Sequence, residues 1–276
     1  MPTELKDYAD ISSVRRIAKR NHVWRGRTAR LGFFMLLICI WQILANLDIW
    51  SEVIFPPPKA VAEAILFGLR DGSLVAAINS SMRRLFLGYG ISLSIGIPLG
   101  LLLGRKQLLD DTIGSLAVGL QALPSICWLP LAVLWFGLSE TAMQFVIVMG
   151  SLMSVVLAVR DGVKSIPVLY VRAAQILGAT GWRFYWFVLF PASLPSIVTG
   201  AKLGWTFAWR SLMAAELLYL VTGIGSTLMT GRELHDMALV VAAMMIIILI
   251  GLLTDRLIFK FGEDFVYQRW GVGGRS

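Results

Sequence analysis

The chain has 276 residues, of which 57% are hydrophobic and only 15% are charged, and its mean hydropathy is +0.73. Soluble domains carry about 25% charged residues, so this composition excludes an ordinary soluble domain and favours a polytopic membrane protein. The net charge of +8 does not indicate nucleic-acid binding, because the basic residues lie in patches between apolar runs and form no basic face on a soluble domain.

Six segments are long and apolar enough to cross a hydrocarbon core of about 30 Å. The first follows a basic tail, 1–30, and is predicted to be a retained anchor because no small-residue cleavage site follows it. The sequence therefore predicts an all-α integral membrane protein that spans the lipid bilayer several times. The predicted spans are 31–49, 85–104, 113–137, 141–159, 194–220 and 236–258.

The distribution of basic residues predicts the orientation. With the N-terminus inside, the inner segments and the inner edge of the last span hold 18 Lys and Arg, whereas the outer segments hold five. Both termini are therefore expected in the cytoplasm, together with the connector 160–193. The expected parts of the chain are a basic tail (1–30), a first span with an external segment (31–84), a core of five spans (85–260) and a C-terminal tail (261–276).

The external segment contains "FPPPKAVAEAILFGLR", from Phe55 to Arg70. Its three consecutive prolines cannot continue a helix, and a short helix is predicted to follow them. Val61, Ile65 and Leu69 share one stripe of that helix, which is expected to lie on the outer surface.

The third predicted span carries prolines at Pro124 and Pro130, which are expected to bend it. Trp128 lies between these prolines. Its indole either lines a cavity at the bend or packs against a neighbouring helix, and the sequence does not separate the two interpretations.

The connector between the fourth and fifth spans contains "RAAQILGATGWRFYWFVLFP", residues 172–191. Its pattern predicts two short helices that break at Gly178, a residue suited to a left-handed helix cap, and end at Pro191. So short a helix pair has no core of its own. Its aromatic residues are therefore expected either to anchor it at the lipid interface or to contact another protein.

This connector resembles the cytoplasmic EAA loop of ABC-importer permeases, which reads Glu-Ala-Ala, three residues, Gly, nine residues, Ile-x-Leu-Pro. Here Arg172 stands in place of Glu, and the pattern continues with Ala173, Ala174, Gly178, Val188, Phe190 and Pro191. The resemblance implies a coupling helix that docks into a cleft of an ATPase subunit. The residues implied in this docking are Arg172, Ala173, Ala174, Gly178, Tyr185 and Pro191.

Other stretches resemble the nitrate/taurine/sulfonate branch of the same permeases. They are "FPPP" after the first span, "LPSICWLPLAVLWFGL" in the third, and "MAAELL" followed by "TGIGS" at the end of the fifth. Their order and their sides of the membrane agree with the topology predicted above. The resemblance therefore implies a type I ABC-importer permease fold.

Three charged residues, Lys202, Arg210 and Glu216, lie within the fifth predicted span, where each would cost about 2.5–3.5 kcal/mol at mid-membrane. We therefore expect them to face protein or a water-filled cavity. At about 100° per residue, one stripe of this helix is the candidate wall of a translocation path, with Arg210 about 80° off it. The stripe contains Lys202, Thr206, Trp209, Met213 and Glu216.

Each charge also has a structural interpretation. Lys202 lies near the inner end, where its ammonium can extend to the headgroups. Glu216, near the outer end, can cap a neighbouring helix or pair with a base on another span. Arg210 has no carboxylate three or four residues away, so its partner is either a transient anionic substrate or a fixed carboxylate on another helix.

The leading hypothesis is the permease subunit of an ATP-driven importer for a small anion of the sulfonate, taurine or nitrate class. The resemblance implies a bacterial inner membrane, a homodimer of permeases, two ABC ATPase subunits and an external solute-binding protein. Because no G-x-x-x-x-G-K-[ST] phosphate loop occurs, ATP and Mg²⁺ are expected on the partner ATPase. The chain itself is expected to hold no cofactor and no metal.

Three alternatives remain open. Some relatives in the resembled family carry neutral or cationic vitamin precursors. A stand-alone secondary carrier would favour inverted repeats with matched broken helices, which are not visible in the sequence. A membrane enzyme would need a cluster of His, Asp or Glu at one depth, but the two adjacent acidic pairs, Asp110-Asp111 and Glu263-Asp264, lie outside the predicted spans.

Overall fold

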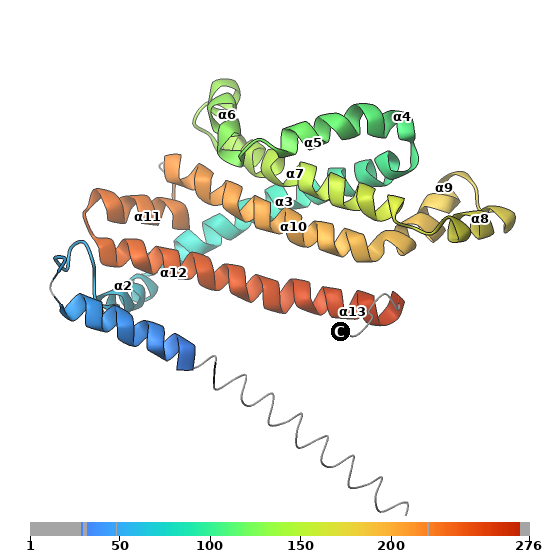
Figure 1. Cartoon of the computed structure of the whole chain (residues 1–276). Coiled ribbons are helices and arrows are strands. Elements are labelled where there is room, and N and C mark those ends of the chain that lie inside the picture. Colours follow the sequence, from blue (N-terminus) through green and yellow to red (C-terminus); the bar gives the residue numbers. More distant parts are fainter. Residues whose placement is uncertain (1–28, 30–31, 48, 220, 271–276) are drawn as a thin grey trace, which may run out of the picture. The chain divides into compact units, whose positions relative to one another are not determined.

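The computed structural model describes residue 29 and residues 32–47, 49–219 and 221–270 (Figure 1). These residues form helices, and no strand occurs among them, so the predicted all-α fold is confirmed. Most of the predicted basic tail 1–30 and the last residues of the tail 261–276 lie outside the described part of the chain. The chain divides into two compact units, residues 1–63 and 64–276.

The first unit contains the apolar helix Gly32–Asn46. The indole N–H of Trp41 in this helix donates a hydrogen bond of 3.0 Å to the carbonyl oxygen of Pro56. Helix α2 (Pro58–Arg70) begins at the third of the three prolines and therefore confirms the predicted short helix. Val61, on its predicted apolar stripe, is buried, whereas Leu69 is 46% exposed.

The second unit contains one long helix, a broken pair of helices and three further long helical segments. In chain order its elements are α3 (Ser73–Arg105), α4 (Gln107–Leu109), η1 (Asp110–Gly114), α5 (Ser115–Gln121), η2 (Ser125–Trp128), α6 (Leu129–Phe136), α7 (Glu140–Lys164), α8 (Val168–Ile176), α9 (Gly181–Phe184), η3 (Tyr185–Leu189), α10 (Phe190–Leu218), α11 (Ile224–Glu233), α12 (Met237–Thr254), η4 (Asp255–Phe259) and α13 (Lys260–Trp270).

Four helical segments of the described residues are long and apolar enough to cross a membrane: Ser73–Arg105, Glu140–Lys164, Gly181–Leu218 and Met237–Val266. The broken pair lies where the third span was predicted and makes a fifth if it is one span, whereas Gly32–Asn46, where the first span was predicted, is an apolar helix shorter than these segments. Helix α3 begins at Ser73 and so extends beyond the second predicted span, 85–104, at its N-terminal end. The part of α3 before this span contains Arg83 and Arg84, which lower the hydropathy without interrupting the helix.

The bend expected in the third predicted span, 113–137, is a break between two helical segments. The segments Gln107–Gln121 and Ser125–Phe136 meet at an angle of 103°. Pro124 at this break has an extended backbone, with φ −54° and ψ 134°. A proline disfavours the helical conformation in the residue before it, which explains why the helix ends at this point.

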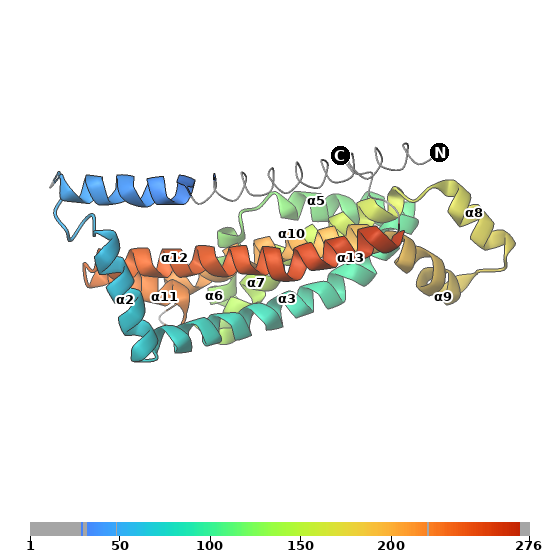
Figure 2. The same cartoon turned by 90° about the horizontal axis from the view of Figure 1, so that it is seen from below.

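Helix α7 packs against both α3 and α10, and the three helices run side by side (Figures 1 and 2). Glycines allow this close approach: a Cβ atom at Gly100 of α3 would lie 2.7 Å from the carbonyl oxygen of Val156 in α7. In both views α8 and α9 lie at one end of these helices and α11 lies at the other. The candidate site residues are therefore distributed along the length of the bundle.

Candidate functional site

Residues 168–189, which we call the connector segment, form the short helix α8 and the first turns of the long helical segment Gly181–Leu218, with a tight turn between them. Gly178 has φ +81°, and its N–H bonds to the carbonyl oxygen of Gln175. The next N–H, of Ala179, bonds to the carbonyl oxygen of Ala174 at 2.9 Å. These are bonds of a left-handed helix cap, so the break predicted at Gly178 is confirmed.

The predicted helix end at Pro191 is wrong. One helical segment runs without interruption from Gly181 to Leu218 and passes through Pro191 in the first turn of α10. The turn before this proline, η3, has the wider π-helical bonding, in which the N–H of Phe190 bonds to the carbonyl oxygen of Tyr185. The wider turn accommodates a residue that has no N–H and whose ring would collide with an ordinary helical turn.

One side of the connector segment packs onto the end of the bundle. Phe184 and Leu189 are buried with Val163 of α7 and Ala174 of α8. The Arg105 guanidinium of α3 lies 4.9 Å from the centre of the Phe184 ring, which is a cation–π contact.

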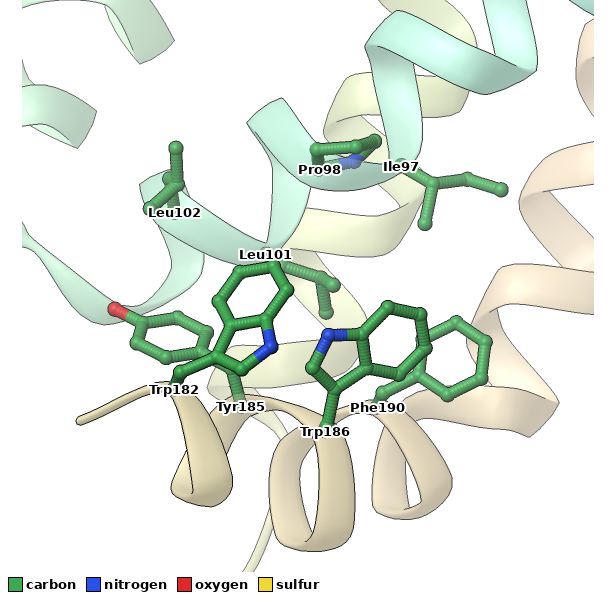
Figure 3. Close-up of a pocket in the computed structure, with 8 residues that line it drawn as sticks. All are labelled: Ile97, Pro98, Leu101, Leu102, Trp182, Tyr185, Trp186 and Phe190. Carbon is green, nitrogen blue, oxygen red and sulfur yellow. The ribbon is translucent and has the colours of Figure 1, made fainter. Parts of the chain in front are cut away.

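The aromatic residues beside this cluster line an apolar cavity of about 240 Å³ against α3. In Figure 3 the ring of Trp186 stands between those of Trp182 and Phe190, opposite Pro98 and Leu101. The residues lining the cavity are Ile97, Pro98, Leu101, Leu102, Trp182, Tyr185, Trp186 and Phe190. These aromatic residues therefore face α3 on one side of the cavity.

The other side of the connector segment is apolar and exposed. Ile176 and Leu177, next to the turn, are each 86% exposed, and Phe187 is 78% exposed. Of the residues that match the EAA pattern, Arg172 and Ala173 are exposed. So many large apolar side chains on one short segment mark a surface that contacts lipid or another protein.

Glu216 lies at the opposite end of α10 and is completely buried. Its carboxylate accepts hydrogen bonds from Arg84 at 2.9 Å, from the Ser81 hydroxyl at 2.8 Å and from the Gly225 N–H at 2.9 Å. Arg84 also pairs with Glu140 at 2.7 Å and donates to the carbonyl oxygen of Thr222. Glu216 thus pairs with a base on another span and binds the first turn of α11, as its structural interpretation required.

Lys202 also has fixed counter-charges. Its ammonium lies 2.9 Å from the Asp255 carboxylate and 3.5 Å from that of Glu263. Glu263 was expected in a solvated tail, but the last long helix continues to Val266 and carries this carboxylate back to α10. The position of Lys202 is therefore explained by packing between α10 and the last helix.

Arg210 has a different environment. Among the described residues no carboxylate lies within 4.0 Å of its guanidinium. The residue lines a cavity of about 330 Å³ between the break after α5, the middle of α7 and α10. Its lining residues are Leu120, Gln121, Ala122, Leu123, Pro124, Ser125, Met149, Gly150, Met153, Ser154, Phe207 and Arg210.

None of the residues of the predicted stripe lines this cavity. Trp209 is 9% exposed in the main core, and Met213 packs against that core. Thr206 is exposed, and its hydroxyl donates to the carbonyl oxygen of Lys202. Trp128 is half-buried, and its ring stacks edge-on against Phe145 with the centroids 6.1 Å apart. The structure therefore separates the stripe into different surroundings, and Arg210 alone of the residues predicted to line the path borders this cavity.

Two groups of charges were missed by sequence reasoning. Arg84 was counted as an external residue, although it lies within α3 and pairs with Glu140 and Glu216. At the other end, Asp110 pairs with Arg160 at 3.4 Å and also with Lys164. The sequence could have indicated the first group, because Ser81 and Arg84 are three residues apart and therefore lie on one face of a helix.

Among the described residues, no cluster of three or more His, Cys, Asp or Glu side chains could hold a metal ion. The polar groups that the structure does assemble are ion pairs between helices and the cavity at Arg210. This arrangement can hold helices in register and present one cation to a small molecule.

The chain is similar to membrane transport proteins over most of its length. Residues 96–262 match the family described as the binding-protein-dependent transport system inner membrane component. A provisionally named ABC transporter permease protein of Methanocaldococcus jannaschii is 36% identical over 85% of this chain and 90% of its own. The taurine transport system permease protein TauC of Escherichia coli is 30% identical over 87% of this chain and 90% of its own.

A solved structure has the same fold. It is an inward-facing conformation of the MetNI methionine ABC transporter, which aligns with a TM-score of 0.58 at 18% identity. The alignment covers 71% of this chain and 95% of that chain. At this level of identity the likeness concerns the arrangement of the helices.

Proposed function

Since the chain belongs to the family of binding-protein-dependent transport system inner membrane components, we propose that it forms the translocation path of an ATP-driven importer. It is an ABC-importer permease of the class that includes taurine, sulfonate and nitrate permeases. In such importers the permease is a transport subunit and not itself an enzyme. We place the chain in a bacterial inner membrane, with both termini and the connector segment in the cytoplasm.

The observation that carries the proposal is the exposed apolar side of the connector segment. The turn at Gly178 projects Ile176 and Leu177 away from the bundle, while Phe184 and Leu189 attach the segment to it. A rigid attachment on one side and an apolar contact surface on the other suit a segment that transmits movement from a partner. The partner is an ABC ATPase, which binds ATP and Mg²⁺ and pushes the connector segment when it closes.

The complete importer then contains two copies of this chain, two ATPase subunits and an external solute-binding protein. ATP-driven closure of the ATPases moves the two connector segments, and the long helices reorient so that the path opens alternately to each side. The substrate is a small anion of the sulfonate, taurine or nitrate class. This substrate class is supported by the 30% identity to a taurine permease and by Arg210, which borders a cavity and has no carboxylate partner in the part of the chain that the structure describes.

Charge insertion on the exposed side of the connector segment tests this function. Ile176→Glu and Leu177→Glu are expected to lower the amount of ATPase that co-purifies with the chain by at least about tenfold. The reason is that a central apolar contact at an interface contributes about 2 kcal/mol or more. Both side chains are 86% exposed, so the substitutions leave the packing of the chain itself unchanged.

The matched control is Leu138→Glu, at a side chain that is 77% exposed beyond the opposite end of α7. This variant should retain the ATPase. If Ile176→Glu and Leu177→Glu also retain it, the connector segment is an interfacial anchor and the proposed coupling is refuted.

A further inference from the structure

The two basic residues of α10 differ in their partners. Lys202 contacts Asp255 and Glu263, whereas Arg210 has no carboxylate within 4.0 Å among the described residues. An unpaired cation within a membrane helix is unfavourable unless it faces water or an anion. Arg210 lies six residues from Glu216, or about 9 Å along the helix, so it is also separate from the ion pairs at that end.

The cavity beside Arg210 contains hydrogen-bonding groups from two other elements. Gln121 at the end of α5 donates to the hydroxyl oxygen of Ser154 in α7 at 3.4 Å, and Ser154 is 98% buried, with 2% of its surface exposed. Ser125 follows the break after α5 and lines the same cavity. Among the described residues that line the cavity, none is acidic, so its charge is positive.

Gly150 of α7 allows these elements to meet. A Cβ atom at this position would overlap the Ser211 hydroxyl of α10 and would lie 3.2 Å from the Cβ of Ser125. The broken third span therefore approaches the crossing of α7 and α10 at the position where α7 has no side chain. At the 103° bend, Ser125 lies beside the same cavity as Arg210.

We infer that this cavity binds the oxyanion group of a small organic anion, of the sulfonate type, as the anion passes through the chain. The Arg210 guanidinium matches an oxyanion in charge and geometry, and the Gln121 amide and the serine hydroxyls can donate to its remaining oxygens. Met149, Met153 and Phe207 line the same cavity and suit a short apolar substituent. The volume of about 330 Å³ lies within the range of small-molecule sites, about 300–1,000 Å³. This inference rests on the proposed function.

Fluorine NMR on the purified complex of this chain with its ATPase tests the inference, with trifluoromethanesulfonate as the probe. The wild-type complex should broaden the probe signal, and ethanesulfonate should reverse the broadening at lower concentration than nitrate. Arg210→Gln should raise the dissociation constant of the probe by at least about tenfold, because it removes the only cation of the cavity lining. Arg210→Lys should retain part of the binding, because the charge remains but the planar pair of donors is lost.

Controls separate this inference from the proposed function. Arg232→Gln, which removes the same charge from an exposed position in α11, should leave probe binding unchanged. Arg210→Gln should still co-purify with the ATPase, because the cavity lies away from the connector segment; the proposed function is refuted if the wild-type chain does not co-purify with an ATPase, whereas the site is refuted by unchanged probe binding in the assembled variant. Should Arg210→Gln fail to fold, Ser154→Ala provides a second test and should weaken probe binding several-fold.

Three results would overturn the inference. The first is unchanged probe binding in Arg210→Gln or Ser154→Ala within an intact complex. The second is equal binding of 2,2,2-trifluoroethanol, which carries no charge. The third is stronger competition by nitrate than by ethanesulfonate, which would exclude a site built for an organic anion.

Discussion

Arg84 connects more elements than any other side chain described above. From α3 it contacts Glu140 at the start of α7, Glu216 near the end of α10 and the Thr222 carbonyl before α11. Glu216 is completely buried and Arg84 is 8% exposed, so both charges depend on their partners for solvation. Removing one member of a buried ion pair leaves the other charge without compensation, which costs far more than the net contribution of the pair.

At this position we predict that Arg84→Ala lowers the free energy of unfolding by about 3–5 kcal/mol. The buried Glu216 carboxylate would retain only Ser81 and the Gly225 N–H as partners. Thermal unfolding of the detergent-purified protein measures the effect. The neighbouring Arg83 is exposed, so Arg83→Ala is the matched control and should change stability by less than about 1 kcal/mol. Equal unfolding temperatures for the two variants would show that the ion pair is dispensable.

The sequence indicated part of this arrangement. Glu216 within an apolar helix required a base from another span or a helix terminus, and the structure supplies both. The sequence did not identify Arg84 as this base. Arg84 lies 132 residues before Glu216, and separation along the chain does not give the distance between two residues in space. A charged residue in an apolar segment therefore predicts that a partner exists without naming it.

Among the elements, the crossing of α3 and α7 depends on the absence of side chains. At Gly100 an added Cβ would lie 2.7 Å from both the Val156 carbonyl oxygen and the Val159 Cβ, and these backbone and branched positions cannot rotate away. At Gly90, on the same helix, no heavy atom lies within 4 Å of such a Cβ. Small residues at crossings let helix backbones approach closely in membrane proteins.

We expect Gly100→Ala to destabilise the protein by about 1–3 kcal/mol, because the extra methyl group forces the two helices apart. Gly90→Ala should be neutral or stabilising by up to about 1 kcal/mol, because alanine favours the helix. Unfolding temperatures of the two variants, purified in parallel, give the comparison. A larger loss in Gly90→Ala than in Gly100→Ala would contradict the packing that the structure shows.

Element types were more predictable than element boundaries. The turn at Gly178 and the helix after the three prolines follow from backbone preferences that act over a few residues. The long α3 and the continuous helix through Pro191 do not. There the ion pair of Arg84 and the π turn before Pro191 compensate for residues that are locally unfavourable in an apolar helix.

At the scale of the whole molecule, functional features lie at both ends of the second unit and between them. The connector segment follows α7 at one end, and the Arg84 ion pairs join α3, α7 and α10 at the other. The Arg210 cavity lies between them on α10. In the importer proposed above, the ATPase would act at the connector segment and the substrate would pass the Arg210 cavity.

Labelling of intact cells tests the orientation of the whole chain. In a background of Cys39→Ser and Cys127→Ser, which removes both native thiols, the Leu138→Cys variant should react with a membrane-impermeant maleimide. The Leu177→Cys variant should react only after the membrane is opened, because the distribution of basic residues predicts that the connector segment is inside. Both side chains are well exposed in the chain, at 77% and 86%, so accessibility differs only by side of the membrane. The reverse pattern would invert the topology and remove the proposed ATPase contact.

The sequence by itself determined the class of protein, the approximate spans, the turn in the connector segment and the family resemblance. These properties depend on hydropathy, on charge asymmetry and on short backbone motifs, all of which are local. Only the tertiary structure decided which charges are paired, because helices that are far apart in the sequence bring Arg84 to Glu216 and Lys202 to Asp255. Within the described ranges the packing of the helices pairs those residues and leaves Arg210 beside a cavity without a carboxylate partner.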